Sequence, residues 1–504
     1  MSKKSSGNIL FEFLMRKNSD YLPEVFLSDS RTSIQIARMV REGSARKLGP
    51  KLYTRNMLDA HEQIVSRNLW QIVAMLAPGT VVSHRTAFES RPAPDGSVFL
   101  TGEYRRQIVL PGLIIRQAKG TGPLAGDMPY MGVLYLASRP RYFLENLLPS
   151  REREAVARTI GREAIENRLA DILRVNGEGA LNRIRDEART IATALKLEDQ
   201  FRTLDGLISG MLSSRMVDLV TPVARAYAAG EPYDPARLSL FEALFAALRI
   251  APWPSRPVRS DIAAAFYNTA FFDAYFSNYI EGTDFPVDQA IRIVFEGEIP
   301  ANRPADAHDV LGTYRLVASR DEMSHRPRDF DDFLFLLKRR HAVILEGRPD
   351  KSPGQFKMQN NQAGSTLFVS PDLVLGTLRQ GFGMYQALDV PFARALFIMF
   401  LIAEVHPFVD GNGRIARVMM NAELISEGQA RIIIPSVYRN EYVNSLKLLT
   451  NYQNPNAFIR VMSHAQQFVD RIDFTQLEAA RKMLAAYNAF FEPADDVKLQ
   501  MPTE

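Results

Sequence analysis

The segment that most constrains this chain is a polar loop, residues 406–414, which lies between two apolar segments of helix length. The apolar run before it, residues 395–403, is typical of a buried helix. The amphipathic pattern after it, residues 415–427, predicts a second helix that stops at Gly428. Because Pro407 cannot continue a helix, the first helix is expected to end at the loop. The chain must therefore bury two helices and present a short polar turn between them.

This turn carries groups that suit a phosphate. Gly411 and Gly413 allow a tight backbone path that presents successive N–H groups at the start of the second helix, where the helix dipole favours an anion. Arg414 and Arg417 lie three residues apart, so both project from one side of the first helical turn. A histidine and an aspartate in the same turn add a base and a metal ligand. A solvated turn would explain the glycines but not this convergence, so the segment predicts a nucleotide site.

Extended to Arg417, the loop has the sequence His-Pro-Phe-Val-Asp-Gly-Asn-Gly-Arg-Ile-Ala-Arg. It resembles the signature of Fic-domain proteins, H-P-F-x-[D/E]-G-N-G-R-x-x-R, and matches it at every fixed position. The resemblance implies a mainly α fold, in which an all-helical Fic domain carries a small β-hairpin flap. It also implies the transfer of AMP from ATP to a hydroxyl group of a target protein.

The same resemblance implies a role for each polar residue of the signature. His406 would be the general base, because a neutral imidazole near pH 7 can accept the hydroxyl proton. Asp410 would hold Mg²⁺, a hard cation that prefers carboxylate and phosphate oxygens. The residues implied to bind the nucleotide are Gly411, Asn412, Gly413, Arg414 and Arg417, with Asn451 in the helical region that follows.

A second motif precedes the signature, near the end of a helix expected over residues 260–281. Ser277, Glu281 and Gly282 are placed as in the inhibitory motif of the family, [S/T]-x-x-x-E-[G/N], which this segment resembles. Ser277 and Glu281 share a helix face, and a carboxylate at a helix C-terminus is unfavourable without a cation. The resemblance supplies Arg417 as that cation and implies that Glu281 obstructs the γ-phosphate. The alternative is an exposed glutamate in a last helical turn.

Residues 354–369 are polar, rich in Gln and Asn, and hairpin-like. Their position ahead of the signature resembles the flap of the family, which holds a target protein by strand-to-strand pairing. Many relatives carry arginine where this chain has Lys357. The residues expected to dock the target are Phe356, Lys357, Leu367 and Phe368.

The region near the N-terminus predicts a helix followed by a small basic hairpin. Ile34, Ile36 and Val40 give one apolar helix face, and residues 44–54 form two short strands about a Gly-Pro turn. This order is typical of a winged helix, and with residues 78–85 it resembles AbiEi-type antitoxin and regulator proteins. The residues that would contact phosphates, if this module binds DNA, are Arg31, Arg38, Arg41, Arg46, Lys47, Lys51 and Arg55. The alternative is an ordinary solvated face on a domain that holds protein partners or its own Fic domain.

At 504 residues the chain is too long for one ordinary core. We expect a mainly α protein in which an α+β, winged-helix-like module precedes the Fic domain. The expected parts are a winged-helix-like domain over residues 1–95, a β then helical segment over 96–213, a linker over 214–235, the Fic domain over 236–470, and a C-terminal helix and tail over 471–504.

Composition excludes several classes of protein. The chain has no cysteine, which rules out disulfides, thiolate metal sites and cysteine nucleophiles. Its formal net charge of +4 is mildly basic and does not by itself indicate nucleic-acid binding. The first eight residues are polar, and the apolar run before the signature is too short to span a bilayer. We therefore expect a cytoplasmic protein without a membrane partner.

Other activities are compatible with the same residues. If Glu281 oriented a water molecule, the enzyme would remove AMP from a modified target. Relatives also transfer UMP or phosphocholine, whereas the kinase-like variant carries lysine where this chain has Gly413, which argues against that reaction. A further alternative is a DNA-binding regulator whose Fic domain only senses nucleotide, although the intact His406 favours catalysis. The sequence leaves open the target, the trigger that relieves inhibition, and whether the chain forms a homodimer.

Overall fold

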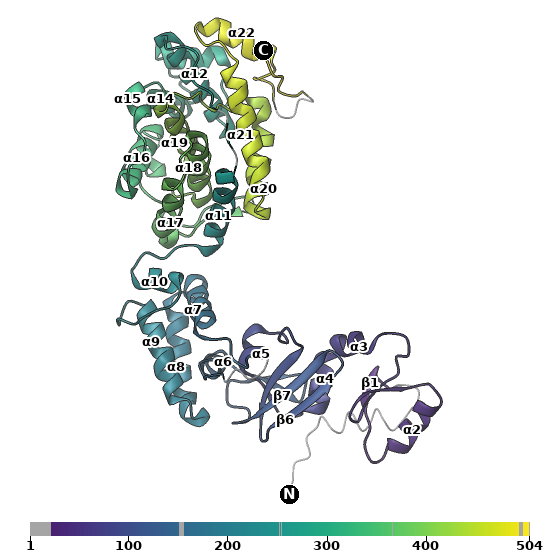
Figure 1. Ribbon diagram of the computed structural model, residues 1–504. Helices are drawn as coiled ribbons and strands as arrows, with labels where there is room; N and C mark the ends of the chain where they lie inside the picture. Colours follow the sequence, from purple (N-terminus) through teal and green to yellow (C-terminus); the bar gives the residue numbers. More distant parts are fainter. Residues whose placement is uncertain are drawn as a thin grey trace. The chain divides into compact units, whose positions relative to one another are not determined.

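The computed structural model (Figure 1) describes residues 22–150, 156–250, 252–253, 255–364, 366–492 and 497–502. The chain forms two compact units, Met1–Gly230 and Glu231–Glu504. The polar first eight residues, on which the expected location depends, lie outside the described residues. Within the described part of the chain, no helix is long and apolar enough to cross a membrane.

A three-stranded antiparallel sheet and one helix open the first unit (Figure 1). Their bounds are β1 (Val25–Leu27), α2 (Ser33–Arg41), β2 (Arg46–Gly49) and β3 (Leu52–Thr54), and the sheet order is β1–β3–β2. The expected helix and basic hairpin are therefore both present. The buried face of α2 is narrower than expected, because Ile36 packs with Phe26 and Ala45 while Ile34 is 82% exposed.

A six-stranded mixed sheet follows, in the order β6–β7–β5–β4–β9–β8. Its strands are β4 (Val81–Val82), β5 (Ser97–Gly102), β6 (Arg106–Leu110), β7 (Leu113–Lys119), β8 (Met128–Tyr130) and β9 (Leu134–Leu136), and the helices next to them in sequence are α3 (His61–Arg67), α4 (Leu69–Leu76) and α5 (His84–Glu89). The β-rich character expected after residue 96 is confirmed. Because β4 pairs with both β5 and β9, the end of the expected domain over residues 1–95 belongs to this sheet instead.

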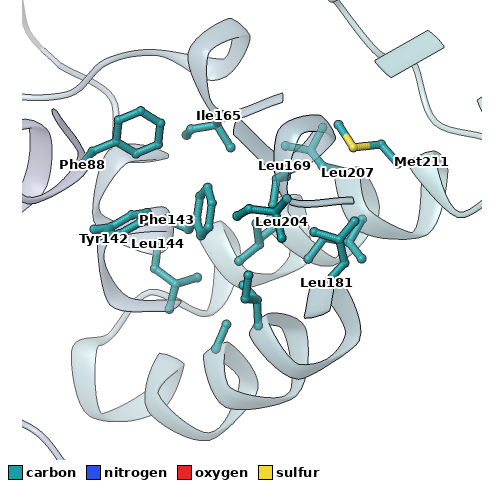
Figure 2. Close-up of a cluster of buried hydrophobic side chains, with 14 of the residues drawn as sticks. Phe88, Tyr142, Phe143, Leu144, Ile165, Leu169, Leu181, Leu204, Leu207 and Met211 are labelled. Atoms are coloured by element: carbon teal, nitrogen blue, oxygen red, sulfur yellow. The ribbon is translucent and has the colours of Figure 1, made fainter. Parts of the chain in front are cut away.

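Helices complete the first unit. They are α6 (Arg139–Asn146), α7 (Arg162–Asn176), α8 (Glu178–Leu195), α9 (Glu198–Met211) and α10 (Pro222–Ala228). Apolar residues at a spacing of four, such as Ile165, Leu169 and Leu173 of α7, give each helix a buried face. Figure 2 shows the resulting cluster, in which side chains from several helices meet at a common centre.

The segment over residues 214–235 is only in part a linker. The two units divide after Gly230, within the expected segment, but α10 lies before that point. The side chain of Thr221 caps α10 by accepting from the N–H of Ala224 at 3.2 Å, and Leu219 and Ala224 are buried in the helical cluster. This helix therefore belongs to the core of the first unit.

The described part of the second unit is helical apart from one hairpin and an isolated bridge between Pro257 and Gln429. Its helices are α11 (Pro235–Ile250), α12 (Ala263–Ile280), α13 (Val287–Ile291), α14 (Pro304–Val317), α15 (Arg320–Ser324), α16 (Phe330–Ile344), α17 (Val374–Gln386), α18 (Pro391–Val405), α19 (Asn412–Ser426), α20 (Arg439–Tyr452), α21 (Pro455–Asp470) and α22 (Leu477–Ala486). The hairpin pairs β10 (Gln362–Ala363) with β11 (Thr366–Leu367) in antiparallel register. In α22, Ala480 and Leu484 are buried with Phe272 of α12, so the expected boundary at residue 470 does not separate two domains.

Candidate functional site

The signature loop joins the two central helices, α18 and α19. The first ends at Val405, and His406 then adopts a left-handed conformation with φ of 53°. A residue before proline is disfavoured in the right-handed helical region, and a positive φ is uncommon for any residue except glycine. Gly411, with φ of 74°, makes the second sharp turn immediately before α19. The loop thus has a strained histidine at one end and a helix N-terminus at the other.

The start of α19 has the geometry of an anion site. The first intrahelical bond runs from the N–H of Ile415 to the carbonyl of Gly411 at 3.0 Å, so the N–H groups of residues 412–414 precede it and point out of the helix end. The side chain of Asn412 does not join them. Its Oδ1 accepts from the N–H of Phe408 and its Nδ2 donates to the Phe408 carbonyl, both at 2.9 Å. Asn412 therefore closes the loop and offers only its backbone to a phosphate.

The geometry of His406 suits a general base. Its Nδ1 lies 3.2 Å from the Ala403 carbonyl, which can only accept, so the ring proton is on Nδ1 and Nε2 is left as an acceptor. Burial lowers the pKa of His406 to about 4, so the imidazole is neutral at neutral pH. The ring of Phe368 stacks on the imidazole with centroids 3.7 Å apart and planes 6° apart. The ring is therefore held in one orientation.

Asp410 is the residue of the loop that fits a metal ion. Its side chain is 40% exposed, and one carboxylate oxygen accepts from the N–H of Gly411 at 2.6 Å. The same oxygen lies 3.6 Å from Arg414 Nη2. Among the residues that the structure describes there is no cluster of three acidic or histidine ligands. One carboxylate completed by substrate phosphates and water is a common arrangement for Mg²⁺, so this donor set fits that ion.

Arg417 is held by the last turn of α12. Its Nη2 donates to Glu281 Oε1 at 2.7 Å and to the Ser277 carbonyl at 2.9 Å, and its Nε donates to Ser277 Oγ at 2.9 Å. The phenol of the buried Tyr442 is also near this guanidinium and, with Glu281, helps to raise the pKa of Arg417. Gly282, with φ of 90°, follows the helix end and turns the chain away. The structure thus brings together Ser277, Glu281 and Arg417 as expected.

The carboxylate of Glu281 lies directly over Gly413. A Cβ atom placed on Gly413 would overlap Glu281 Oε1 and would lie 3.0 Å from Arg417 Nη1. Glu281 therefore covers the start of α19, where the backbone N–H groups favour an anion. A negative side chain already occupies the position at which a phosphate would bind.

Arg414 has a partner that the sequence did not reveal. Its Nη1 lies 2.6 Å from Asp309 Oδ2 on α14 and 3.4 Å from Asn278 Oδ1. Asp309 also accepts from Arg348 Nε at 2.8 Å. The side chains of Arg414 and Asp309 are 3% and 1% exposed. Arg414 is thus fixed by the protein before any nucleotide binds.

The four flap residues expected to dock the target do not all face the same way. The N–H of Lys357 donates to the Pro407 carbonyl at 2.9 Å, and its buried Nζ donates to Asn361 Oδ1 at 2.6 Å. Burial lowers the pKa of Lys357 to about 8. Phe356 lies against Phe408, and Phe368 covers His406, so these side chains face the loop. Of the four expected docking residues, only Leu367, which is 55% exposed, faces outward.

Two other charged residues support the flap. Arg237 of α11 pairs with the buried Glu404 of α18 at 2.5 Å and donates to the Leu367 carbonyl of β11. The other carboxylate oxygen of Glu404 accepts from Thr450 of α20 at 2.7 Å. A buried acid immediately before the signature was a signal that sequence reasoning passed over. Asn451, beside Thr450, is exposed in the last turn of α20.

The chain is similar to several known proteins that carry a Fic domain. Residues 334–424 match the family model described as Fic/DOC family. A protein adenylyltransferase fic-1 of Caenorhabditis briggsae is 28% identical over 214 residues, which are 40% of this chain and 41% of that protein. A Fido domain-containing protein of Dictyostelium discoideum is 32% identical over 106 residues, which are 20% of this chain and 74% of that protein. A solved Fic domain-containing signaling protein from Bacteroides thetaiotaomicron has a TM-score of 0.36 and 18% identity, with 48% of this chain and 97% of that chain covered. The chain spans less than half the length of the Caenorhabditis relative.

Proposed function

This chain belongs to the Fic/DOC family, and we propose that it is a protein adenylyltransferase, which moves AMP from ATP to a hydroxyl side chain of a target protein. The observation that carries the proposal is the neutral His406, whose Nε2 is left to accept a proton a few residues before the anion site of α19. Matched relatives named protein adenylyltransferases support this reaction.

The transfer forms a bond between the target oxygen and the α-phosphorus of ATP and breaks the bond to the bridging oxygen, so pyrophosphate leaves. His406 Nε2 takes the hydroxyl proton as the new bond forms. The N–H groups at the start of α19 and the guanidinium of Arg414 stabilise charge on the phosphate oxygens. Mg²⁺ held by Asp410 would supply further positive charge at the leaving phosphates. The flap, with Leu367 outward, would pair with the target backbone.

The same proposal includes autoinhibition by Glu281. Its carboxylate pairs with Arg417 at 2.7 Å and covers Gly413, so the γ-phosphate of ATP must displace it to reach Arg417. The side chain of Glu281 is 30% exposed, which gives the carboxylate room to turn toward water. ATP that binds beside an undisplaced Glu281 would have its α-phosphate out of line with the base.

The experiment that tests both parts measures label transfer from α-labelled ATP with Mg²⁺, to the chain itself and to proteins of a cell lysate. We expect weak labelling by the native chain, strong labelling by Glu281→Gly, and none by Glu281→Gly/His406→Ala. Parallel reactions with α-labelled UTP and CTP identify the preferred nucleotide. Loss of label from a modified target on adding the native chain would indicate AMP removal as a second activity. Absence of transfer from every nucleotide, despite ATP binding, would contradict the proposal.

A second candidate function is DNA binding by the first unit, favoured by its exposed basic surface. Arg41, Lys47 and Lys51 are exposed on α2 and its hairpin. Two of the other basic residues, Arg46 and Arg38, are less suited to phosphates, since Arg46 donates to two backbone carbonyls and Arg38 pairs with Glu42 at 2.6 Å.

A salt series with duplex DNA and the full chain tests this second function. Replacing Arg41, Lys47 and Lys51 by Gln should weaken binding and reduce the salt dependence by about three counterions. DNA affinity that does not change with salt or with these substitutions would instead favour a protein-docking role for the unit.

A further inference from the structure

The side chain of His341, on α16, is fully buried between the flap and the signature loop. Its Nδ1 accepts from the N–H of Gly354 at 2.9 Å, and its Nε2 lies 2.9 Å from the carbonyl of Asp410. A backbone N–H can only donate and a carbonyl can only accept, so the ring carries its proton on Nε2. The imidazole also stacks on Phe408, with centroids 3.6 Å apart and planes 6° apart. Both ring nitrogens are therefore hydrogen-bonded to the backbone, and one ring face is stacked on Phe408.

The two hydrogen bonds reach different functional segments. Gly354 begins the flap, has φ of 74°, and packs closely on α16, since a Cβ there would lie 3.0 Å from the Lys338 carbonyl. The bond to Asp410 orients the peptide that carries the metal-binding carboxylate and leads into Gly411. A Cβ on Gly411 would lie 3.3 Å from His341 Nε2, so the turn is packed against the imidazole. One side chain thus fixes the start of the flap and the turn before α19.

We propose that His341 is a positioning residue that couples the flap to the Mg²⁺-binding carboxylate. It holds the Asp410 peptide through Nε2–H and the first residue of the flap through Nδ1, so target docking and metal placement depend on one ring. It is not a catalytic residue, because it is buried and both nitrogens are already bonded to the protein. The inference rests on the proposed transfer reaction and on Asp410 as the metal ligand.

Two substitutions separate the two bonds. In His341→Gln the amide nitrogen lies near the position of Nε2 and can still donate to the Asp410 carbonyl. In His341→Asn the amide oxygen lies near the position of Nδ1 and can still accept from Gly354. Both are made in the Glu281→Gly chain, with His325→Gln, a change to an exposed histidine of the same unit, as the matched control.

We expect the two substitutions to affect different constants. His341→Asn should raise the Mg²⁺ concentration for half-maximal transfer by about 10- to 100-fold, with the KM for the target protein little changed. His341→Gln should raise the KM for the target, with the Mg²⁺ requirement nearly native. His341→Phe, which keeps the stacking and loses both bonds, should show both changes. Equal loss of kcat in all three, with neither constant shifted, would mean a purely structural role and would overturn the proposal.

Two further measurements keep the inference separate from folding and from the proposed reaction. In the unsubstituted chain, a long-range proton–nitrogen NMR spectrum should show the His341 proton on Nε2, and a proton on Nδ1 would overturn the proposal. If Glu281→Gly shows no transfer, the proposed function has failed. Calorimetry of ATP binding with and without Mg²⁺ then still tests His341, because the Mg²⁺ enhancement must be lost in His341→Asn and kept in His341→Gln.

Discussion

The two signature arginines lie one turn apart on α19 and meet carboxylates in different surroundings. Arg414 pairs with Asp309, whose side chain is 1% exposed and is shared with Arg348. Arg417 pairs with Glu281, whose side chain is 30% exposed at the end of α12. Breaking a fully buried pair leaves charges that water cannot reach, whereas a partly exposed carboxylate can rotate into solvent. The comparison indicates that Arg414 is a fixed part of the site and that Arg417 can be released.

The largest expected effect comes from removing the buried partner. Asp309→Ala removes the carboxylate that Arg414 and Arg348 share, and it should lower the free energy of unfolding by about 3–5 kcal/mol. In the Glu281→Gly chain it should also abolish AMP transfer, because Arg414 loses its orientation. Urea unfolding and label transfer measure the two quantities. Asp306→Ala is the matched control, since Asp306 also pairs with Arg348 but is 27% exposed. If Asp306→Ala loses as much stability and AMP transfer as Asp309→Ala, the burial of Asp309 does not make its pair with Arg414 special.

Removing the releasable partner should act in the opposite direction on activity. Glu281→Gly should raise transfer about 5- to 150-fold, which corresponds to about 1–3 kcal/mol of coupling. Its cost in stability should be about 1 kcal/mol, because Ser277 still accepts from Arg417. The same transfer and urea measurements apply. A destabilisation as large as that of Asp309→Ala would show that the two pairs are equivalent after all.

A smaller rise in AMP transfer is expected when a side chain is introduced into the space that the Glu281 carboxylate occupies. The methyl group in Gly413→Ala overlaps Glu281 Oε1, the mobile end of that side chain, and should displace it. Transfer should rise about fivefold, less than in Glu281→Gly, because the methyl also narrows the phosphate site. Added to Glu281→Gly, the substitution should give no further rise. A similar rise in both chains would mean that the methyl acts on something other than Glu281.

The smallest expected effect is that of pH on the rate of AMP transfer. It tests whether protonation of His406 contributes to the differences in rate between these variants. Burial lowers the pKa of His406 to about 4, so between about pH 6 and pH 8 the imidazole stays neutral and transfer by Glu281→Gly should change less than about twofold. As the pH falls from about 6.5 toward 4, the unfolded chain binds a proton that the folded chain does not, so stability declines there. A rate that halves near pH 6.5 would contradict this assignment.

Much of the site could be predicted because its residues lie close together in the sequence. The signature lies within one loop and one helical turn, and the pair formed by Ser277 and Glu281 follows helical spacing. Asp309 and His341 could not be found in this way. Each is a single polar residue on an amphipathic helix, and nothing in its neighbours distinguishes it from a solvated one. Only the packing of α14 and α16 against α19 and its loop brings these residues to the signature.

The fold also divides into features that follow from local sequence patterns, which could be predicted, and features that do not. Helices with regular apolar spacing and the β-rich stretch after residue 96 were expected, because periodicity is a local property, whereas the short strand β4 was not. No orientation could be predicted for the flap side chains, since strands of two residues are too short for alternation to show which face is inward. Lys357 and Phe368, which lie outside these two strands, face the loop. The helix α10 was taken for linker because a seven-residue helix gives too short a pattern to recognise.

The bare Cα of Gly413 has a consequence for how sequences of this kind can change. The space that a side chain would fill there is the space that the carboxylate of Glu281 occupies. A substitution at either position therefore alters what the other can tolerate, although the two lie on different helices and far apart along the chain. As the carboxylate of Glu281 is placed here, it is compatible with glycine at position 413 and not with a residue that carries a Cβ atom.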